Sequence, residues 1–178
     1  MDFESSETYQ NLIAAYTEES KVRNKYEMFA QRAESDGLYV LSNIFQKTAD
    51  NEKEHAELWY KTLCDGQVLS EPDNLAESAK AEHYEHDQLY AGYAKKAMEE
   101  GYSEISEKFQ LVAEIEQQHA QRFDQYIQQF NSDTLLKKET PVKWICTKCG
   151  HIYEGAEAPM VCPVCSHSKG FFDVSYEQ

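Results

Sequence analysis

Apolar side chains recur every three or four residues between about residues 7 and 130, the spacing of amphipathic helices that each bury one face. The first such segment runs from Glu7 to Ser35, and "SDG" at 35–37 then supplies a glycine suited to a helix C-terminal cap. The second segment covers residues 38–63, the third covers 75–100, and the fourth begins near Ser103, a plausible N-cap. The pattern predicts four long helices.

The connections between these helices indicate a topology. The turns at 35–37 and 100–103 are short, whereas residues 64–74 contain Gly66 and Pro72 and are too long for a tight hairpin. Short, long and short connections predict a four-helix bundle with one crossover. The inward-facing positions are Leu12, Ala15, Glu19, Val22, Tyr26 and Phe29; Leu41, Phe45, Thr48, Glu52, His55 and Trp59; Ala79, Glu82, Glu85 or His86, Leu89 and Tyr93; and Ile105, Phe109, Val112, Glu116, His119, Phe123, Ile127 and Phe130.

Composition narrows the possible functions. The formal net charge is −15, and the last 36 residues carry only 3 Lys and 4 Asp or Glu, so the acidity lies in the helical part. An acidic surface repels phosphate backbones, which argues against nucleic-acid binding. We find no apolar run long enough for a membrane span and no basic, apolar leader at the N-terminus. A cytoplasmic location is the default expectation.

Acidic and imidazole side chains occupy inward positions that packing would give to leucine. Glu-x-x-His occurs twice, at Glu52–His55 and Glu116–His119, although about one such pair is expected by chance. The other two helices each place a glutamate at an inward position near mid-helix, Glu19 and Glu82, and the two halves of the chain hint at an internal repeat. Burying like charges costs several kcal/mol per ion unless cations neutralise them. Two Glu and two Glu-x-x-His motifs match the ligand set of ferritin-like di-iron and di-manganese proteins.

The alternative is a misassigned helix register that leaves these residues on the surface, where glutamate is common. Glu85 lies three residues after Glu82 and faces the same side, either as a ligand in one oxidation state or as an acid outside the site. Tyr26 and Tyr90 follow Glu19 and Glu82 by seven and eight residues, and each is either a hydrogen-bond donor to the site or a packed aromatic. We expect no catalytic role for three further residues, namely His83, His86 and Cys64.

Four of the five cysteines form two Cys-x-x-Cys pairs near the C-terminus. Such pairs build a tetrahedral sulfur site for zinc or iron, and zinc would be structural whereas iron would carry one electron. Two domains joined by a linker are predicted: the bundle at 1–133, a polar linker at 134–142 and a small β-rich domain at 143–178. The four predicted thiolate ligands are Cys146, Cys149, Cys162 and Cys165.

The chain resembles the rubrerythrin family essentially end to end. The resemblance rests on "EESKVRNKYEMFA" (18–30), "TADNEKEHA" (48–56), "AEHYEHDQLYAGYAKKAMEEG" (81–101), "AEIEQQHAQRF" (113–123) and the rubredoxin-like tail. It implies a ferritin-like bundle with a non-haem di-iron site, and Fe(Cys)4 in the tail. Ser166 departs from the rubredoxin pattern, in which glycine commonly follows the second cysteine pair. The implied iron ligands in the bundle are Glu19, Glu52, Glu82, Glu85, Glu116, His55 and His119.

By the same resemblance, Glu52 and Glu116 bridge the irons, and His55 and Glu85 exchange on one iron as its redox state changes. The implied activity is the reduction of hydrogen peroxide to water, with electrons entering singly through the tail from NAD(P)H and a separate reductase. The chain itself has no visible nucleotide motif. A homodimer is the family expectation. Two alternatives are a ferritin-like ferroxidase or iron-handling protein, and a helical scaffold that carries a structural zinc ribbon.

Overall fold

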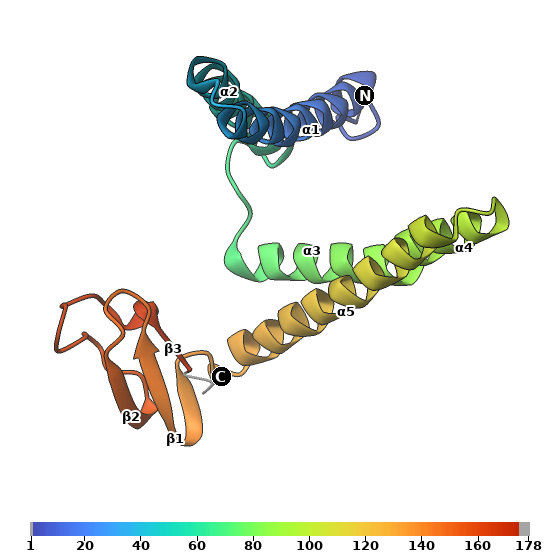
Figure 1. Ribbon diagram of the computed structural model, residues 1–178. Coiled ribbons are helices and arrows are strands. Elements are labelled where there is room, and N and C mark those ends of the chain that lie inside the picture. Colours follow the sequence, from blue (N-terminus) through green and yellow to red (C-terminus); the bar gives the residue numbers. More distant parts are fainter. Residues whose placement is uncertain (1, 175–178) are drawn as a thin grey trace. The chain divides into compact units, whose positions relative to one another are not determined.

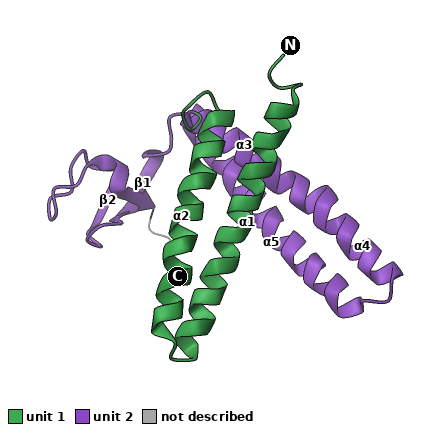
Figure 2. Ribbon diagram, turned by 90° about the horizontal axis from the view of Figure 1, so that it is seen from above, with its two compact units in different colours: residues 1–69 green, residues 70–178 purple. Residues whose placement is uncertain are grey.

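The structure is a computed structural model that describes residues 2–174. The chain divides into two compact units, residues 1–69 and 70–178 (Figures 1 and 2). The extreme ends of the predicted domains, residue 1 and residues 175–178, lie outside the described residues. Four long helical rods and a C-terminal three-stranded sheet confirm the predicted fold class. Within the described part of the chain, no helix combines the length and apolarity needed to cross a membrane.

Unit 1 is a hairpin of two helices, α1 (Glu7–Ser35) and α2 (Tyr39–Leu63). The Ser6 side chain accepts a hydrogen bond from the backbone N–H of Tyr9 and so caps the start of α1. Gly37 takes a positive φ of 74° in the turn, and the N–H of Leu38 donates to the carbonyl of Ala33 at 2.8 Å. This is the glycine-based helix ending that the sequence indicated. The two helices meet through four buried alanines, Ala30, Ala33, Ala49 and Ala56.

Unit 2 begins with a second helical hairpin. Its first rod is α3 (Glu71–Tyr84), a π-helical segment η1 (Glu85–Tyr90) and α4 (Ala91–Glu99), and its second rod is α5 (Ser103–Asn131). The expected helix at 75–100 is therefore corrected in two respects. It starts at Glu71, because Pro72 fits the first helical turn, and a π-helix interrupts its α-helical hydrogen bonding. The rods meet through small buried residues, Ala79, Ala94, Ala97, Ser106, Ala113 and Ala120.

A separation of 64 residues relates the two hairpins. Gly37 and Gly101 both take positive φ in the hairpin turns, and the N–H of Tyr102 donates to Ala97 as that of Leu38 donates to Ala33. The buried alanines follow the same rule, since Ala30, Ala33, Ala49 and Ala56 correspond to Ala94, Ala97, Ala113 and Ala120. The repeat suspected from the positions of the acids is therefore a repeat of the packing as well.

The C-terminal sheet contains β1 (Lys137–Cys146), β2 (Ile152–Glu157) and β3 (Phe172–Val174) in the antiparallel order β2-β1-β3, with a short helix η2 (Lys169–Phe171) before β3. Trp144 is fully buried at its centre, and its indole N–H donates to the carbonyl of Gly155 at 2.9 Å. Because β1 starts at Lys137, residues 137–142 belong to the sheet rather than to the linker expected at 134–142.

Candidate metal centres

Unit 1 gathers three of the predicted ligands at the middle of its hairpin. Glu19 of α1 and Glu52 and His55 of α2 offer ligand atoms that all lie within 4.8 Å of one another. His55 Nδ1 is 2.9 Å from Glu52 Oε2 and 3.7 Å from Glu19 Oε1. The i, i+3 spacing places Glu52 and His55 on one face of α2. The hairpin therefore holds two carboxylates and one imidazole around one point.

Unit 2 repeats this arrangement with Glu82 of α3 and with Glu116 and His119 of α5, again within 4.8 Å. His119 Nδ1 lies 2.8 Å from Glu116 Oε2 and 3.3 Å from Glu82 Oε2. Six of the seven predicted Glu and His ligands thus fall into two groups of three, one in each unit. Whether the two groups share one site stays a prediction of the sequence analysis.

Ionising the carboxyl groups of these two groups costs electrostatic free energy. Burial raises the pKa of Glu19, and the neighbouring Glu52 carboxyl raises it further by hydrogen bonding and by repulsion, against a smaller opposing effect of His55. Burial likewise raises the pKa of Glu82, and its hydrogen bond with Glu116 adds to the effect. Two carboxyl groups that share a proton form a pocket suited to a cation, because a cation removes the repulsion. Oxygen and imidazole donors suit iron or manganese.

Glu85 is not a member of the second group of three. It is half-buried at the first residue of the π-helix, three residues after Glu82. Burial raises the pKa of the Tyr90 hydroxyl, and the negative charges of Glu85 and Glu116 raise it further, so these three side chains share one electrostatic environment. Glu85 therefore faces the ligand-bearing side of unit 2 without belonging to its tightest cluster.

The two candidate tyrosines occupy equivalent aromatic clusters. Tyr26 packs against Phe29 and Phe45 with ring centroids 6.1 and 6.2 Å away. Tyr90 packs against Tyr93 and Phe109 at 6.2 and 6.1 Å. The reading of both tyrosines as packed aromatics is supported, and a role in hydrogen bonding to the site stays a prediction.

The four cysteines of the C-terminal domain form one cluster. Cys146 Sγ lies 3.7 Å from Cys165 Sγ, and Cys149 Sγ lies 3.7 Å from Cys162 Sγ. A disulfide requires about 2.05 Å, whereas a tetrahedron of thiolates with metal–sulfur bonds of about 2.3 Å has sulfur–sulfur edges of about 3.8 Å. Burial raises the pKa of Cys162, but hydrogen bonds from the backbone of Cys165 and Val164 lower it to about 7. The sulfur geometry therefore fits a metal site with four cysteine ligands.

Each cysteine pair is followed by a tight turn with a positive φ. Gly150 has φ of 76° and Ser166 has φ of 59°, and the N–H of each donates to the carbonyl of the first cysteine in its pair. Ser166 thus adopts the glycine-like conformation of the first turn at some cost in strain. The departure from the rubredoxin pattern leaves the shape of the cysteine cluster intact.

The residues expected to have no catalytic role have structural contacts or lie apart from the groups. His83 Nε2 is 3.0 Å from Asp124 Oδ2 and joins α3 to α5, and His86 Nδ1 is 2.9 Å from the carbonyl of Ala113. Cys64 is half-buried just after α2.

Trp59 was predicted only as a core residue, yet its buried indole N–H has no hydrogen-bond partner among the described residues.

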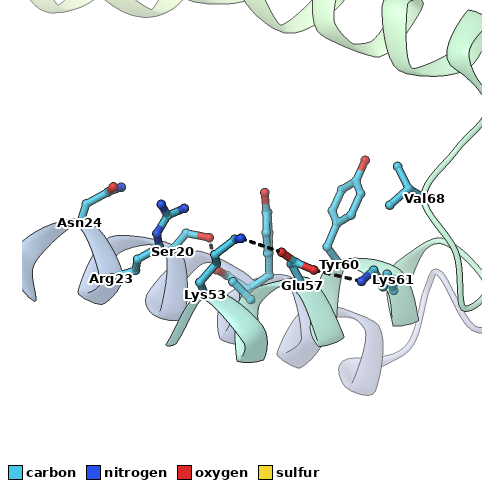
Figure 3. Close-up of a pocket in the computed structure, with 10 residues that line it drawn as sticks. Ser20, Arg23, Asn24, Lys53, Glu57, Tyr60, Lys61 and Val68 are labelled. Carbon is cyan, nitrogen blue, oxygen red and sulfur yellow. Dashed lines mark hydrogen bonds and ion pairs between the residues drawn. The ribbon is translucent and has the colours of Figure 1, made fainter. Parts of the chain in front are cut away.

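A groove of about 440 Å³ also lies along the α1/α2 hairpin (Figure 3). Lys53 and Lys61 flank Glu57 there, 3.5 and 3.0 Å from its oxygens. Tyr16 and Tyr60 pack together with ring centroids 5.4 Å apart. None of the predicted metal ligands lines this groove, so we assign it no part in the metal chemistry.

Comparisons with known proteins agree with both centres. The sequence matches the rubrerythrin family over residues 10–127 and again over 73–148, and the rubrerythrin rubredoxin-like domain over 144–173. It is 36% identical over 180 residues to the rubrerythrin of Nitratidesulfovibrio vulgaris, covering 95% of this chain and 94% of that protein. It is also 36% identical to the rubrerythrin of Clostridium perfringens, covering 97% and 96%.

Solved structures of nigerythrin are similar in sequence. One in a mixed-valence state is 28% identical, covers 96% of this chain and 87% of the other, and superposes with a TM-score of 0.36. Another, in the fully reduced all-ferrous state, is 27% identical, covers 96% of this chain and 87% of the other, and superposes with a TM-score of 0.37.

Proposed function

The chain belongs to the rubrerythrin family, and on that premise we propose that it reduces hydrogen peroxide to water. Its cofactors are the iron of the rubredoxin-like four-cysteine site and the di-iron site of the Glu and His residues. One observation carries the proposal: a single chain contains both two Glu/Glu/His groups and a group of four cysteines. A structural zinc ribbon needs no acidic pockets, and iron storage needs no electron carrier.

The reaction consumes two electrons and two protons for each H2O2 and forms two waters. When bound, a pair of ferrous ions would supply the two electrons, and an iron held by the four cysteines would supply a single-electron path for their return. The carboxylates keep the net charge of the site nearly constant, because each can accept a proton or bind a cation as the total positive charge changes. The raised pKa values of Glu19 and Glu82 support this role.

Individual roles follow from position. We assign Glu19, Glu52 and His55 to one half of the ligand set and Glu82, Glu116 and His119 to the other, and Glu52 and Glu116 would be the ligands shared by both irons. Glu85 lies outside the tight cluster but shares the electrostatic environment of Tyr90 and Glu116, so we propose that it would serve as the alternative ligand in place of His55 when the oxidation state changes. We propose Tyr26 and Tyr90 as hydrogen-bond donors to the di-iron site.

The electron donor is proposed to be a cytoplasmic NAD(P)H-dependent reductase of the rubredoxin type. The apolar side chains beside the cysteines support docking of such a partner, since Met160, Val161 and Val164 are all exposed. The tail would then carry electrons between that reductase and the di-iron site.

A steady-state assay tests the proposal. Iron-loaded protein with a supplied rubredoxin reductase is expected to oxidise NADH only when peroxide is added. Glu52→Gln combined with His55→Gln should abolish this turnover, whereas Glu54→Gln, an exposed acid on the same helix, should leave it unchanged. Oxygen-dependent accumulation of ferric mineral without NADH turnover would instead identify a ferroxidase.

A further inference from the structure

The groove on the α1/α2 hairpin gathers positive charge in an otherwise acidic unit (Figure 3). Residues 1–69 contain 7 Lys or Arg and 13 Asp or Glu. Three of the seven cations line the groove, namely Arg23, Lys53 and Lys61, together with one of the thirteen acids, Glu57. All of the lining residues belong to unit 1. The groove is therefore a local cationic site on a chain whose formal net charge is −15.

The 64-residue repeat shows that a hairpin of this kind does not require these cations. The groove residues of α2 have uncharged or acidic counterparts on α5. The pairs are Lys53 and Gln117, Tyr60 and Asp124, and Lys61 and Gln125. The counterpart of Arg23 falls in the π-helical segment Glu85–Tyr90, whose sequence "EHDQLY" contains neither Lys nor Arg. Buried alanines and metal ligands are repeated between the hairpins whereas the groove cations are not, so helix packing does not explain them.

The cations are oriented by neighbouring acids but remain open to solvent. Lys53 Nζ lies 3.5 Å and Lys61 Nζ lies 3.0 Å from the carboxylate oxygens of Glu57. The guanidinium of Arg23 donates to Glu27 Oε1 from Nε at 3.3 Å and from Nη2 at 3.1 Å. The three cationic side chains are 39–49% exposed. Ion pairs this exposed are weak, so a more highly charged anion can displace the carboxylates.

An aromatic wall and two polar side chains complete the groove. Tyr16 and Tyr60 pack with ring centroids 5.4 Å apart and an angle of 41° between their planes. Ser20 and Asn24 also line the groove, and Asn24 and Tyr60 project from the same side of the hairpin (Figure 3). Arginine and lysine bind phosphate oxygens, and aromatic side chains stack on nucleobases. A volume of about 440 Å³ is in the range of small-molecule sites.

We propose that this groove binds a nucleoside phosphate, with the phosphate groups against Arg23 and Lys53 and the base against Tyr60. Lys53 and Lys61 are eight residues apart, or about 12 Å along α2, which matches an extended ligand better than a single phosphate ion. Lys53 directly follows Glu52, and successive residues of a helix point about 100° apart. The groove and the metal ligands therefore lie on different faces of the hairpin, and the inference does not depend on the proposed peroxide reduction.

Calorimetric titration of ADP into the full-length, iron-loaded protein tests the site. Arg23→Gln combined with Lys53→Gln should weaken ADP binding by about tenfold or more, because two charged donors to the phosphates are lost. Lys21→Gln combined with Lys47→Gln is the matched control, since it removes the same charge from exposed positions of α1 and α2 outside the groove. Equal weakening by both pairs, or no binding of ADP by wild-type protein, would overturn the proposal.

Glu57 provides a test in the opposite direction. Its carboxylate competes with the ligand for Lys53 and Lys61, so Glu57→Gln should tighten ADP binding by about threefold. Glu54→Gln makes the same change of charge at an exposed position of α2 outside the groove and should change the affinity less. A side chain with a purely structural role gives no such gain, and an equal gain in the two variants would contradict a local site.

Two further titrations identify which part of the ligand is bound and where. Tyr60→Leu should weaken the binding of ADP but not that of inorganic pyrophosphate, which has no base. If wild-type protein bound pyrophosphate as tightly as ADP, the nucleoside assignment would be wrong. The variant with Glu52→Gln and His55→Gln should bind ADP as wild-type protein does, and loss of binding would place the nucleotide at the metal ligands instead. Circular dichroism checks that each variant retains its helices.

Discussion

Tyr90 lies eight residues after Glu82, whereas Tyr26 lies seven residues after Glu19, and the π-helix at Glu85–Tyr90 accommodates the additional residue. Because a π-helix has more residues per turn than an α-helix, Tyr90 returns to the same aromatic cluster that Tyr26 occupies in the other hairpin. The extra residue falls in the segment that contains Glu85. Counted from Glu19 and Glu82, the position of Glu85 corresponds to Val22.

The electrostatic pairing of Tyr90 and Glu85 predicts a specific titration. The pKa of Tyr90 is raised by burial and by the charges of Glu85 and Glu116. In metal-free protein, Glu85→Gln should lower the pKa of Tyr90, because the phenolate then faces one fewer negative charge. NMR of tyrosine-labelled protein can follow the resonance, which Tyr90→Phe identifies by its disappearance. An unchanged pKa would show that the two groups do not interact.

The acids of the two groups predict how the stability of metal-free protein depends on pH. The folded-state pKa values of Glu19 and Glu82 are raised, so the folded state holds protons that the unfolded chain has released. Their contribution to stability is therefore present at low pH and is lost as the pH rises from about 4.5 through the raised values. Urea unfolding of the metal-free protein should show this loss, and Glu19→Gln and Glu82→Gln should each reduce it.

Removal of metal is expected to lower the melting temperature. A metal that binds only the folded chain stabilises it by about 2.7 kcal/mol at a concentration 100-fold above its Kd. Calorimetry of loaded and chelator-treated protein measures the difference. The variant with Glu52→Gln and His55→Gln separates the contribution of the Glu and His ligands from that of the four-cysteine site. Because it retains the four cysteines, the difference between its loaded and stripped melting temperatures should be smaller. Equal melting temperatures for loaded and stripped wild-type protein would contradict the convergence of acids.

The two cysteine turns predict a pair of opposite substitutions. Ser166→Gly should stabilise the C-terminal domain by about 1 kcal/mol, since glycine tolerates the left-handed conformation that serine adopts at φ 59°. Gly150→Ser should destabilise it by a similar amount for the converse reason. Denaturant unfolding of the zinc-substituted protein, followed by the fluorescence of Trp144, compares the two. A loss of stability in Ser166→Gly would mean that the serine side chain contributes a contact of its own.

The alanine contacts predict that larger side chains are not tolerated inside the hairpins. Ala49→Leu should destabilise the protein by about 1–3 kcal/mol, because the buried alanine has no space for additional carbons. Ala14→Leu, at an exposed position of α1, should have little effect. Urea unfolding of the two variants measures the contrast, and equal stabilities would show that α1 and α2 do not pack through Ala49.

Periodicity predicted the helices well because each has a regular apolar face, and it placed the Glu and His residues of each group on adjoining faces. It did not reveal the π-helix, although the eight-residue spacing from Glu82 to Tyr90 was a visible signal. It also did not reveal that Ala30 and Ala49 are the residues that become buried, since an alanine at an inward position is compatible with any neighbour. The start of β1 was missed because Lys137, Lys138 and Glu139 resemble a linker in composition.

The alanine contacts also determine how rigid the metal-binding hairpins are. Alanine has no rotamers to lose on folding, and its small side chain lets two helix backbones approach closely. A helix contact made of alanines offers no alternative side-chain packing that the two helices could adopt. Glu19 and Glu52 are therefore carried by a stiff frame, on which their carboxylates move by rotation about their own side-chain bonds rather than with the backbone.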